Sequence, residues 1–226
     1  MSILKAKISR VLIIVAHPDD EVLGCGATIA KHINNGDKVQ VVFLTDGFSS
    51  RDNDSNRDSS AEKASKVLGC MRPVFLNFPD NQLDTISLLE IVKKVEKSIE
   101  SFQPNIVYTH HFGDLNIDHQ ITHRAVITAC RPQPDFCVKE IYSFEILSAT
   151  HWQSLSMENA FNPNYFIDVN EFMDSKMRAL QCYDSEMRDY PHARSYKAVE
   201  SLAKFRGGLA GLMAAEAFTI ERLIKI

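Results

Sequence analysis

The stretch RVLIIVAHPDDEVLGCG, residues 10–26, places a run of charged residues between an apolar segment and a pair of glycines. Segment 10–17 is continuously apolar between Arg10 and His17 and rich in β-branched residues, as expected for a strand covered on both faces. Residues 21–37 follow with the apolar spacing of a helix that ends near Gly36. The junction holds one imidazole and three carboxylates: His17, Asp19, Asp20 and Glu21. Such crowding is costly unless a salt bridge, a helix amino terminus or a metal ion supplies positive charge.

Strand-like and helix-like segments alternate along the chain up to residue 150. Strands are expected at 10–17, 38–47, 73–80, 104–111 and 138–147, and further helices at 58–69, 87–102 and 119–130. This alternation predicts an α/β fold with a mainly parallel sheet and helices on both faces. The polar stretch 48–60 is expected to be a mobile loop.

The pattern weakens after residue 150. A short strand is expected at 164–169 and helices at 172–183 and 194–218, the last broken or closely packed at its glycines. We expect one domain over 1–226, with a core at about 8–150 and a C-terminal strand and helices at about 160–226.

The expected strand order brings two polar clusters together. In a doubly wound sheet, ligands bind beyond the carboxyl ends of the strands, where the strand order reverses. For the order 3-2-1-4-5, that crevice lies between the first and fourth strands. The first strand ends at His17, and the fourth ends at His110 and His111, just before FGDLNIDH. Two His/Asp clusters that are far apart in the chain should therefore meet.

These clusters have the composition of a metal site. Imidazole and carboxylate without thiolate suit Zn²⁺ or another borderline divalent ion. His17 and Asp20 lie three residues apart across a turn that contains Pro18, and His119 is the best candidate for a third ligand. Three ligands leave the open position that catalysis needs, and Asp19 would lie beside the metal as a general base. An H-x-x-D pair is also common in structural roles, so the spacing alone does not decide.

A dinucleotide site is disfavoured. The GCG at 24–26 matches part of a G-x-G-x-x-G fingerprint, but the third glycine position holds Ile29. The acidic run also lies where a pyrophosphate would approach. Gly24 and Gly26 are instead expected to allow close packing of helix and sheet.

Composition narrows the partners and the compartment. The chain has 226 residues, 45% of them hydrophobic and 24% charged, with a formal net charge of −4. No basic surface is expected, which disfavours nucleic acid, and no stretch approaches the ~18 apolar residues of an integral membrane segment. The five cysteines are scattered and lack a C-x-x-C motif, which is typical of reduced thiols and favours a cytoplasmic protein.

Several of these motifs together resemble one known family. AHPDDE after an apolar strand, with D-x-N-x-D-H at 114–119, is similar to the LmbE-like, or PIG-L, zinc-dependent N-acetylglucosaminyl deacetylases. The similarity spans most of residues 10–130 and includes TDG at 45–47, R…A…LG at 57–69 and FPD at 78–80. YPHARS at 190–195 and AAEAF at 214–218 resemble the tail of bacterial members.

The resemblance implies a Rossmann-like fold with zinc held by His17, Asp20 and His119. Asp19 would activate zinc-bound water against the acetamide of an N-acetylated amino sugar or its conjugate, and zinc would stabilise the oxyanion. The products would be acetate and a free amine. Arg57 and Asp80 match positions that hold sugar hydroxyls, although a solvated loop charge and a turn-forming aspartate are equally good interpretations.

One position departs from the family pattern. Many members carry a histidine three residues before the third ligand, where this chain has Asn116. An amide can donate a hydrogen bond to an oxyanion but cannot protonate a departing amine. Asn116 is therefore expected to contact substrate, and the proton donor stays open between Asp19 acting twice, His110, His111 and His192.

The leading hypothesis is a metal-dependent N-deacetylase. Two alternatives stay open: an amide hydrolase for a non-sugar amine, and a metal-binding domain without catalysis. Asp19 argues against the second, since a structural site needs no free carboxylate at the metal. We also expect a homo-oligomer, because the tail GGLAGLMAAEAFTIERLIKI is more apolar than a solvated helix should be, unless it folds back on the sheet.

Overall fold

The computed structural model describes residues 8–47, 57–154, 156 and 158–225. Residues 48–56 of the expected loop lie outside this range, and α2 begins at Arg57. In chain order the strands and α-helices are β1 (Arg10–Val15), α1 (Asp20–Asn34), β2 (Lys38–Thr45), α2 (Arg57–Leu68), β3 (Val74–Phe78), α3 (Leu88–Phe102), β4 (Ile106–His110), α4 (Ile117–Ala129), β5 (Glu140–Phe144), β6 (Tyr165–Asp168), α5 (Met173–Gln181), α6 (Tyr196–Ala210) and β7 (Ala215–Leu223).

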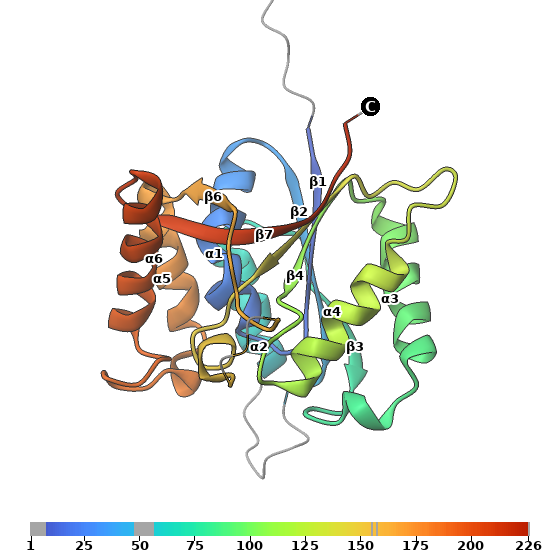
Figure 1. Cartoon of the computed structure of the whole chain (residues 1–226), viewed down its shortest axis with the longest axis horizontal. Coiled ribbons are helices and arrows are strands. Elements are labelled where there is room, and N and C mark those ends of the chain that lie inside the picture. Colours follow the sequence, from blue (N-terminus) through green and yellow to red (C-terminus); the bar gives the residue numbers. More distant parts are fainter. Residues whose placement is uncertain (1–7, 48–56, 155, 157, 226) are drawn as a thin grey trace, which may run out of the picture.

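The strands form one sheet in the order β3-β2-β1-β4-β5-β7-β6 (Figure 1). The pairs among β1 to β5 are parallel, whereas β7 is antiparallel to both β5 and β6. The first five strands have the expected order 3-2-1-4-5. The prediction of a mainly parallel α/β sheet is therefore confirmed, and the carboxyl ends of β1 and β4 are neighbours.

Residues of β1 alternate between two hydrophobic layers. Val11, Ile13 and Val15 pack in the layer that α1, α2 and α5 cover, whereas Leu12 and Ile14 pack in the layer under α3 and α4. Figure 1 shows these two groups of helices on opposite sides of the sheet. All five side chains are fully buried. Burial on both faces explains why the strand is apolar at every position from Val11 to Val15.

The C-terminal segment contains a strand where the sequence predicts helix. The helix expected at 194–218 ends at Ala210, because Gly211 takes a left-handed conformation (φ 71°) that stops it. Residues 215–223 form β7 and pair with a strand on each side. Alanine favours helix, but burial between two strands outweighs that preference. The prediction of helix over 211–218 is therefore wrong.

This strand also removes the basis for the expected homo-oligomer. Ala215, Ala217 and Phe218 lie inside the sheet and are at most 4% exposed. The apolar tail thus follows the alternative in which it folds back on the sheet. A homo-oligomer stays a prediction without that support.

β7 also holds α1 in place. Glu216 accepts hydrogen bonds from the backbone N–H groups of Ala27 and Thr28 (3.1 and 2.7 Å), just after Cys25 leaves helical geometry (φ −145°). Lys176 of α5 pairs with this buried carboxylate at 2.6 Å. A buried charge is tolerated when it is paired and hydrogen-bonded. The cluster therefore fixes the kinked helix that follows the charged junction.

Gly24 allows α1 to lie against the sheet, as expected. A Cβ atom at this position would lie 2.2 Å from Cδ2 of Phe144, a fully buried ring at the end of β5. Gly24→Ala should therefore lower the free energy of unfolding by about 1–3 kcal/mol, because the ring or the helix must move. Urea unfolding measures the change. Gly208→Ala is the control, since its methyl group meets nothing within 4 Å; equal stability of the two variants would contradict the close packing.

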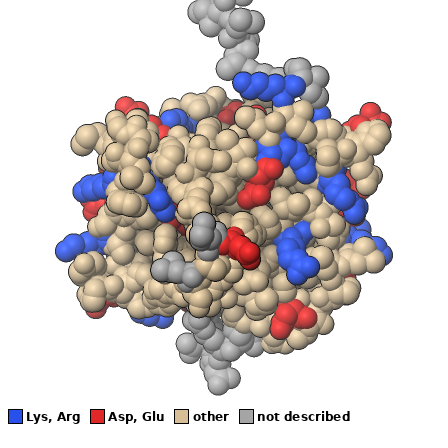
Figure 2. All heavy atoms as spheres, in the orientation of Figure 1, with Lys and Arg blue, Asp and Glu red and all other residues tan. Residues whose placement is uncertain are grey.

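Charges of both signs occur on the surface. Figure 2 shows lysine and arginine side chains together with acidic ones on the same face. No helix within the described ranges is long and apolar enough to cross a membrane.

Candidate metal centre and active site

The two His/Asp clusters meet beyond the carboxyl ends of β1 and β4. His17 follows β1, Asp20 begins α1, and His119 lies in the first turn of α4. Nδ1 of His17, Oδ2 of Asp20 and Nε2 of His119 form a triangle with sides of 3.2 Å. Ligand atoms at about 2.0–2.2 Å from a tetrahedral zinc ion lie about 3.3–3.6 Å from one another. The triangle (hereafter the metal triangle) therefore fits one such ion.

Carboxylates face the outer nitrogen of each imidazole. Nδ1 of His119 lies 3.2 Å from Oδ2 of Asp114. Nε2 of His17 lies 3.1 Å from Oδ1 of Asp80 and 3.2 Å from Oδ2 of Asp118. Such partners fix the tautomer and orientation of a metal-binding histidine. From the sequence, neither Asp114 nor Asp118 was assigned a role.

A second set of atoms is also close enough to hold an ion: His17, Asp80 and Asp118. In that set, Asp118 already accepts backbone hydrogen bonds from Asn81 and Leu83 (2.8 and 3.0 Å). In the metal triangle, by contrast, Oδ2 of Asp20 accepts a backbone hydrogen bond from His17 at 2.9 Å, and Oδ1 is buried and accepts none from any described residue. Two imidazoles and one carboxylate are also a donor set of catalytic zinc sites, whereas the second set offers one imidazole and two carboxylates. The metal triangle is therefore the better candidate.

The centre favours positive charge. Burial lowers the pKa of His119, but the carboxylates of Asp20 and Asp114 outweigh burial and raise that pKa to about 9. Burial also opposes protonation of His17, yet hydrogen bonds that its ring donates to carboxylates, chiefly that of Asp118, raise its pKa well above the usual range. Burial alone would favour the neutral form of both rings. The surrounding carboxylates thus supply the negative field that a divalent cation needs.

Asp19 lies next to the metal triangle in a strained backbone conformation. Its φ of 119° is one that non-glycine residues rarely adopt. Strain of this kind persists where the surrounding structure enforces it, and it concentrates at functional sites. Oδ2 accepts a hydrogen bond from Nη1 of Arg194 at 2.7 Å, whereas Oδ1 is buried with no donor in the part of the chain described. Burial raises the pKa of Asp19 to about 6, against the effect of Arg194.

Arg194 is a site residue that sequence reasoning missed. The motif at 190–195 was recognised, but this arginine received no role. Its Nε donates to Oγ of Ser148 at 2.8 Å, and its Nη1 lies 3.8 Å from Oε2 of Glu186 in addition to contacting Asp19. The motif YPHARS was the available signal in the sequence. It did not reveal the contact with Asp19, because 175 positions separate Arg194 and Asp19 in the chain.

The structure separates the histidines considered as proton donors. His110 stacks on His119 with ring centroids 3.9 Å apart, and its Nε2 accepts the backbone N–H of Ala16 at 2.9 Å. His110 therefore packs against the His119 corner of the metal triangle. Nε2 of His111 lies 3.1 Å from a backbone carbonyl oxygen. His192, by contrast, lines the same cavity as His119.

The structure puts the three residues that were expected to contact substrate in different surroundings. Arg57 is buried at the start of α2, with Nη2 2.5 Å from Oε2 of Glu186. Asp80 faces the outer side of the metal triangle. Asn116 caps α4, where its Oδ1 accepts the backbone N–H of Asp118 at 2.8 Å. Of the three, Asn116 is the one that borders the cavity as the described residues define it.

This cavity, of about 400 Å³, opens next to the metal triangle. One side comes from the start of α4, with Asn116 and His119. The other sides come from a short helix, η2 (Thr150–Trp152), and from the segment after α5 that carries His192 and Arg194. Cavities of this size hold small molecules such as a sugar.

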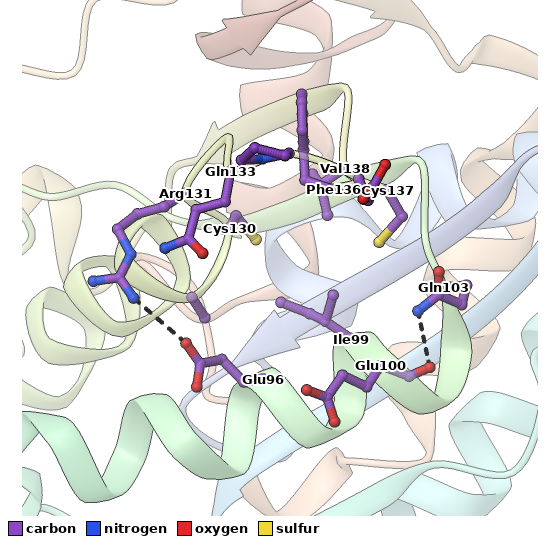
Figure 3. A pocket seen from close by; sticks show the side chains of 13 residues that line it. Glu96, Ile99, Glu100, Gln103, Cys130, Arg131, Gln133, Phe136, Cys137 and Val138 are labelled. Carbon is purple, nitrogen blue, oxygen red and sulfur yellow. Dashed lines mark hydrogen bonds and ion pairs between the residues drawn. The ribbon is translucent and has the colours of Figure 1, made fainter.

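A second cavity, of about 260 Å³, lies at the opposite end of the sheet, between α3, the end of α4 and the segment before β5 (Figure 3). Arg131 and Glu96 pair with each other there at 3.7 Å. Cys130 and Cys137 border it, and burial raises the pKa of both thiols. Neither group of candidate metal ligands among the described residues belongs to it, so it is not the candidate site.

The chain is thus an α/β protein whose sheet carries, at its switch point, a group of His and Asp side chains that could hold a metal ion. Residues 12–130 match the PIG-L family, described as GlcNAc-PI de-N-acetylase. The chain belongs to this family, which confirms the resemblance seen in its motifs.

Individual relatives agree with this assignment. The chain is 34% identical over 183 residues to the uncharacterized deacetylase YaiS of Escherichia coli (strain K12), covering 77% of this chain and 90% of that protein. It is 25% identical over 230 residues to the diacetylchitobiose deacetylase of Thermococcus kodakarensis, covering 92% and 82%. The structure of N,N′-diacetylchitobiose deacetylase from Pyrococcus horikoshii superimposes with a TM-score of 0.76 at 24% identity, covering 95% and 84%, and thus shares the fold.

Proposed function

We propose that this protein is a metal-dependent deacetylase that hydrolyses the acetamide of an N-acetylated amino sugar or its conjugate. The observation that carries the proposal is the position of Asp19, a carboxylate next to a buried His/Asp/His triangle that opens on a sugar-sized cavity. Membership of the PIG-L family and the deacetylase relatives support it.

His17, Asp20 and His119 would hold the metal ion. Two imidazoles and one carboxylate suit zinc, and a site with three protein ligands is of the catalytic type. When bound, the ion would polarise the acetamide carbonyl and lower the pKa of water. Asp114 and Asp118 would keep the two imidazoles in their orientation.

Asp19 is the proposed general base. Hydrolysis adds water to the carbonyl carbon, breaks the C–N bond, and moves one proton to the departing amine. Asp19 suits the acceptance of that proton because Arg194 holds Oδ2, while Oδ1 has no donor in the described ranges. Arg194 is a positioning residue that fixes the carboxylate in its strained place.

The proton returns to the departing amine from Asp19, which took it from water. Nδ1 of His192 accepts the backbone N–H of Arg194 at 3.0 Å, so a neutral ring carries its proton on Nε2. That N–H can donate a hydrogen bond to a ligand in the cavity that His192 lines. Asn116 supplies no proton, and its amide caps α4 while forming part of the wall.

The zinc-loaded protein should release acetate from N-acetyl sugars. The test is a panel of N-acetylglucosamine, N,N′-diacetylchitobiose, N-acetylglucosaminides and N-acetylated amines that lack a sugar, with acetate and primary amine measured together. Equal amounts of both products are expected, as is loss of activity on chelation and recovery with zinc. Release only from N-acetylated amines that lack a sugar would favour the non-sugar hydrolase. No release from fully loaded protein would favour a non-catalytic metal-binding domain.

A further inference from the structure

The cavity beside the metal triangle has a wall that the metal centre does not use. Trp152 of η2 contributes to it, and so do Arg188 and His192 of the segment 187–195, which follows the short helix η4 (Asp184–Glu186). This wall lies in the C-terminal third of the chain, outside the residues matched to the family. It is therefore a place where this chain can set its own specificity.

The segment 187–195 is anchored to the catalytic side of the cavity. The backbone N–H of Arg188 donates to the carbonyl oxygen of Arg194 at 3.0 Å. The side chain of Arg194 in turn contacts Asp19 and Ser148 at 2.7 and 2.8 Å. Arg188 is thus held at a fixed place relative to the proposed base.

Among the described residues that line the cavity, Arg188 carries a charge that no ion pair neutralises. Glu186 pairs with Arg57 at 2.5 Å, and Arg194 pairs with Asp19 at 2.7 Å. Arg188 forms no ion pair with a described residue, and its Nη1 donates only to the backbone oxygens of Ser185 and Met187, both at 2.7 Å. These two bonds orient the guanidinium and leave Nη2 and Nε for a ligand. A guanidinium presented in this way is suited to a carboxylate or a phosphate.

Trp152 offers an apolar surface next to this charge. The side chain is 54% exposed although it is large and aromatic. Its ring meets the ring of His192 edge-on, with centroids 5.5 Å apart and an interplanar angle of 77°. This contact supports one side of the indole and leaves the rest of it to the cavity. An aromatic ring at a cavity wall suits the apolar face of a sugar.

We propose that the substrate is an N-acetyl sugar that carries an anionic substituent, either a carboxylate or a phosphate, with the sugar ring against Trp152 and the anion on Arg188. The inference rests on the proposed deacetylase function and names the substrate class of the same site. Because Arg188 lies at the exposed rim, the interaction weakens as salt screens it.

Two pairs of compounds test the charge requirement on the full-length, zinc-loaded protein. The first pair is an N-acetylglucosaminide with a carboxylate-bearing aglycone and the methyl ester of the same compound. The second pair is N-acetylglucosamine 1-phosphate and methyl N-acetylglucosaminide. In at least one pair, the charged member should have a KM about 10- to 100-fold lower at low ionic strength. The pair that shows the difference identifies carboxylate or phosphate as the anion.

Variants assign the effect to the cavity wall. Arg188→Gln should remove the difference within the pair, Arg188→Lys should keep part of it, and Trp152→Ala should raise KM for all four compounds. Arg178→Gln, which removes an exposed arginine of α5 outside the cavity, is the matched control and should keep the difference. Loss of the difference in this control would mean that overall charge, rather than Arg188, produces it.

Calorimetric binding of the same four compounds to the Asp19→Asn protein separates this inference from the proposed function. Charge-dependent binding that needs Arg188, without acetate release by the unmodified protein, would overturn the deacetylase function and keep the binding site. Acetate release with equal KM in both pairs would overturn the anionic substrate and keep the deacetylase. Absence of both charge-dependent binding and acetate release would overturn both the anionic substrate and the deacetylase function.

Discussion

Asp19→Asn should lower the turnover number for acetate release by about 10²–10⁴-fold while the protein keeps close to one metal ion per chain. Asp20 is committed to the metal triangle, so its ligating oxygen is not free to take a proton. Asp19 adjoins it on the same turn, with Oδ1 buried and without a donor in the described part of the chain. The amide of asparagine keeps the shape of this side chain but accepts no proton at neutral pH.

The substitution removes the base without disturbing the backbone. Asparagine is among the residues that best tolerate positive φ, so it can adopt the 119° of this position, which alanine would do only with strain. Asp135→Asn is the matched control, because Asp135 is exposed and also has a positive φ, 67°. Steady-state kinetics and metal analysis on both variants decide the role. Near-native turnover by Asp19→Asn would move the role of base to another group.

The central strands β1, β2 and β4 were predictable because most of their residues are buried on both faces of the sheet. A continuous apolar run such as 11–15 then marks a strand without any alternation to interpret. Since parallel strands end on the same side of a sheet, His17 and His119 could be expected to meet on topology alone. Nδ1 of His17 lies 3.2 Å from Nε2 of His119, which agrees with that expectation.

β7 could not be predicted, because local preference and tertiary environment disagree there. The sequence LMAAEAF has the alanine content of a helix, and Gly211 signals only that the helix stops. Pairing of this segment with β5 and β6 depends on strands some fifty or more residues earlier in the chain, which no local pattern records. The function of Glu216 in holding α1 was hidden for the same reason.

The roles of the site residues were predictable only where those residues are neighbours in the sequence. Asp19 and Asp20 share one turn, so one could be assigned to the metal and the other left as a base. Asp80 was expected either to hold a sugar hydroxyl or to form a turn, and its carboxylate faces Nε2 of His17 at 3.1 Å. Arg57 was expected either to hold a sugar hydroxyl or to be a solvated loop charge, and it is buried and pairs with Glu186. In both cases the residue type was informative, but the direction of the side chain depends on the fold.

His119→Ala should lose stoichiometric zinc and yet stay folded. The variant removes one corner of the metal triangle, and two remaining ligands bind zinc weakly. α4 keeps the buried side chains that attach it to the sheet, among them Ala125 and Val126. Metal analysis after dialysis measures the loss, and far-ultraviolet circular dichroism with a thermal scan checks the fold. His32→Gln is the control, because His32 pairs with Asp37 at 2.8 Å at the other end of α1 and should not affect the metal.

The same variant distinguishes the two sets of ligands that share His17. If the ion were held by His17, Asp80 and Asp118, His119→Ala would keep about one zinc per chain, and Asp118→Asn would lose it. We expect the reverse order of loss, because Asp118 uses its oxygens on the backbone N–H groups of Asn81 and Leu83, and its carboxylate orients His17. Asp118→Asn should then weaken zinc about 10- to 100-fold, as loss of an orienting carboxylate typically does, rather than abolish it. Zinc retained by His119→Ala and lost by Asp118→Asn would place the ion in the second set and remove Asp19 from its role as base.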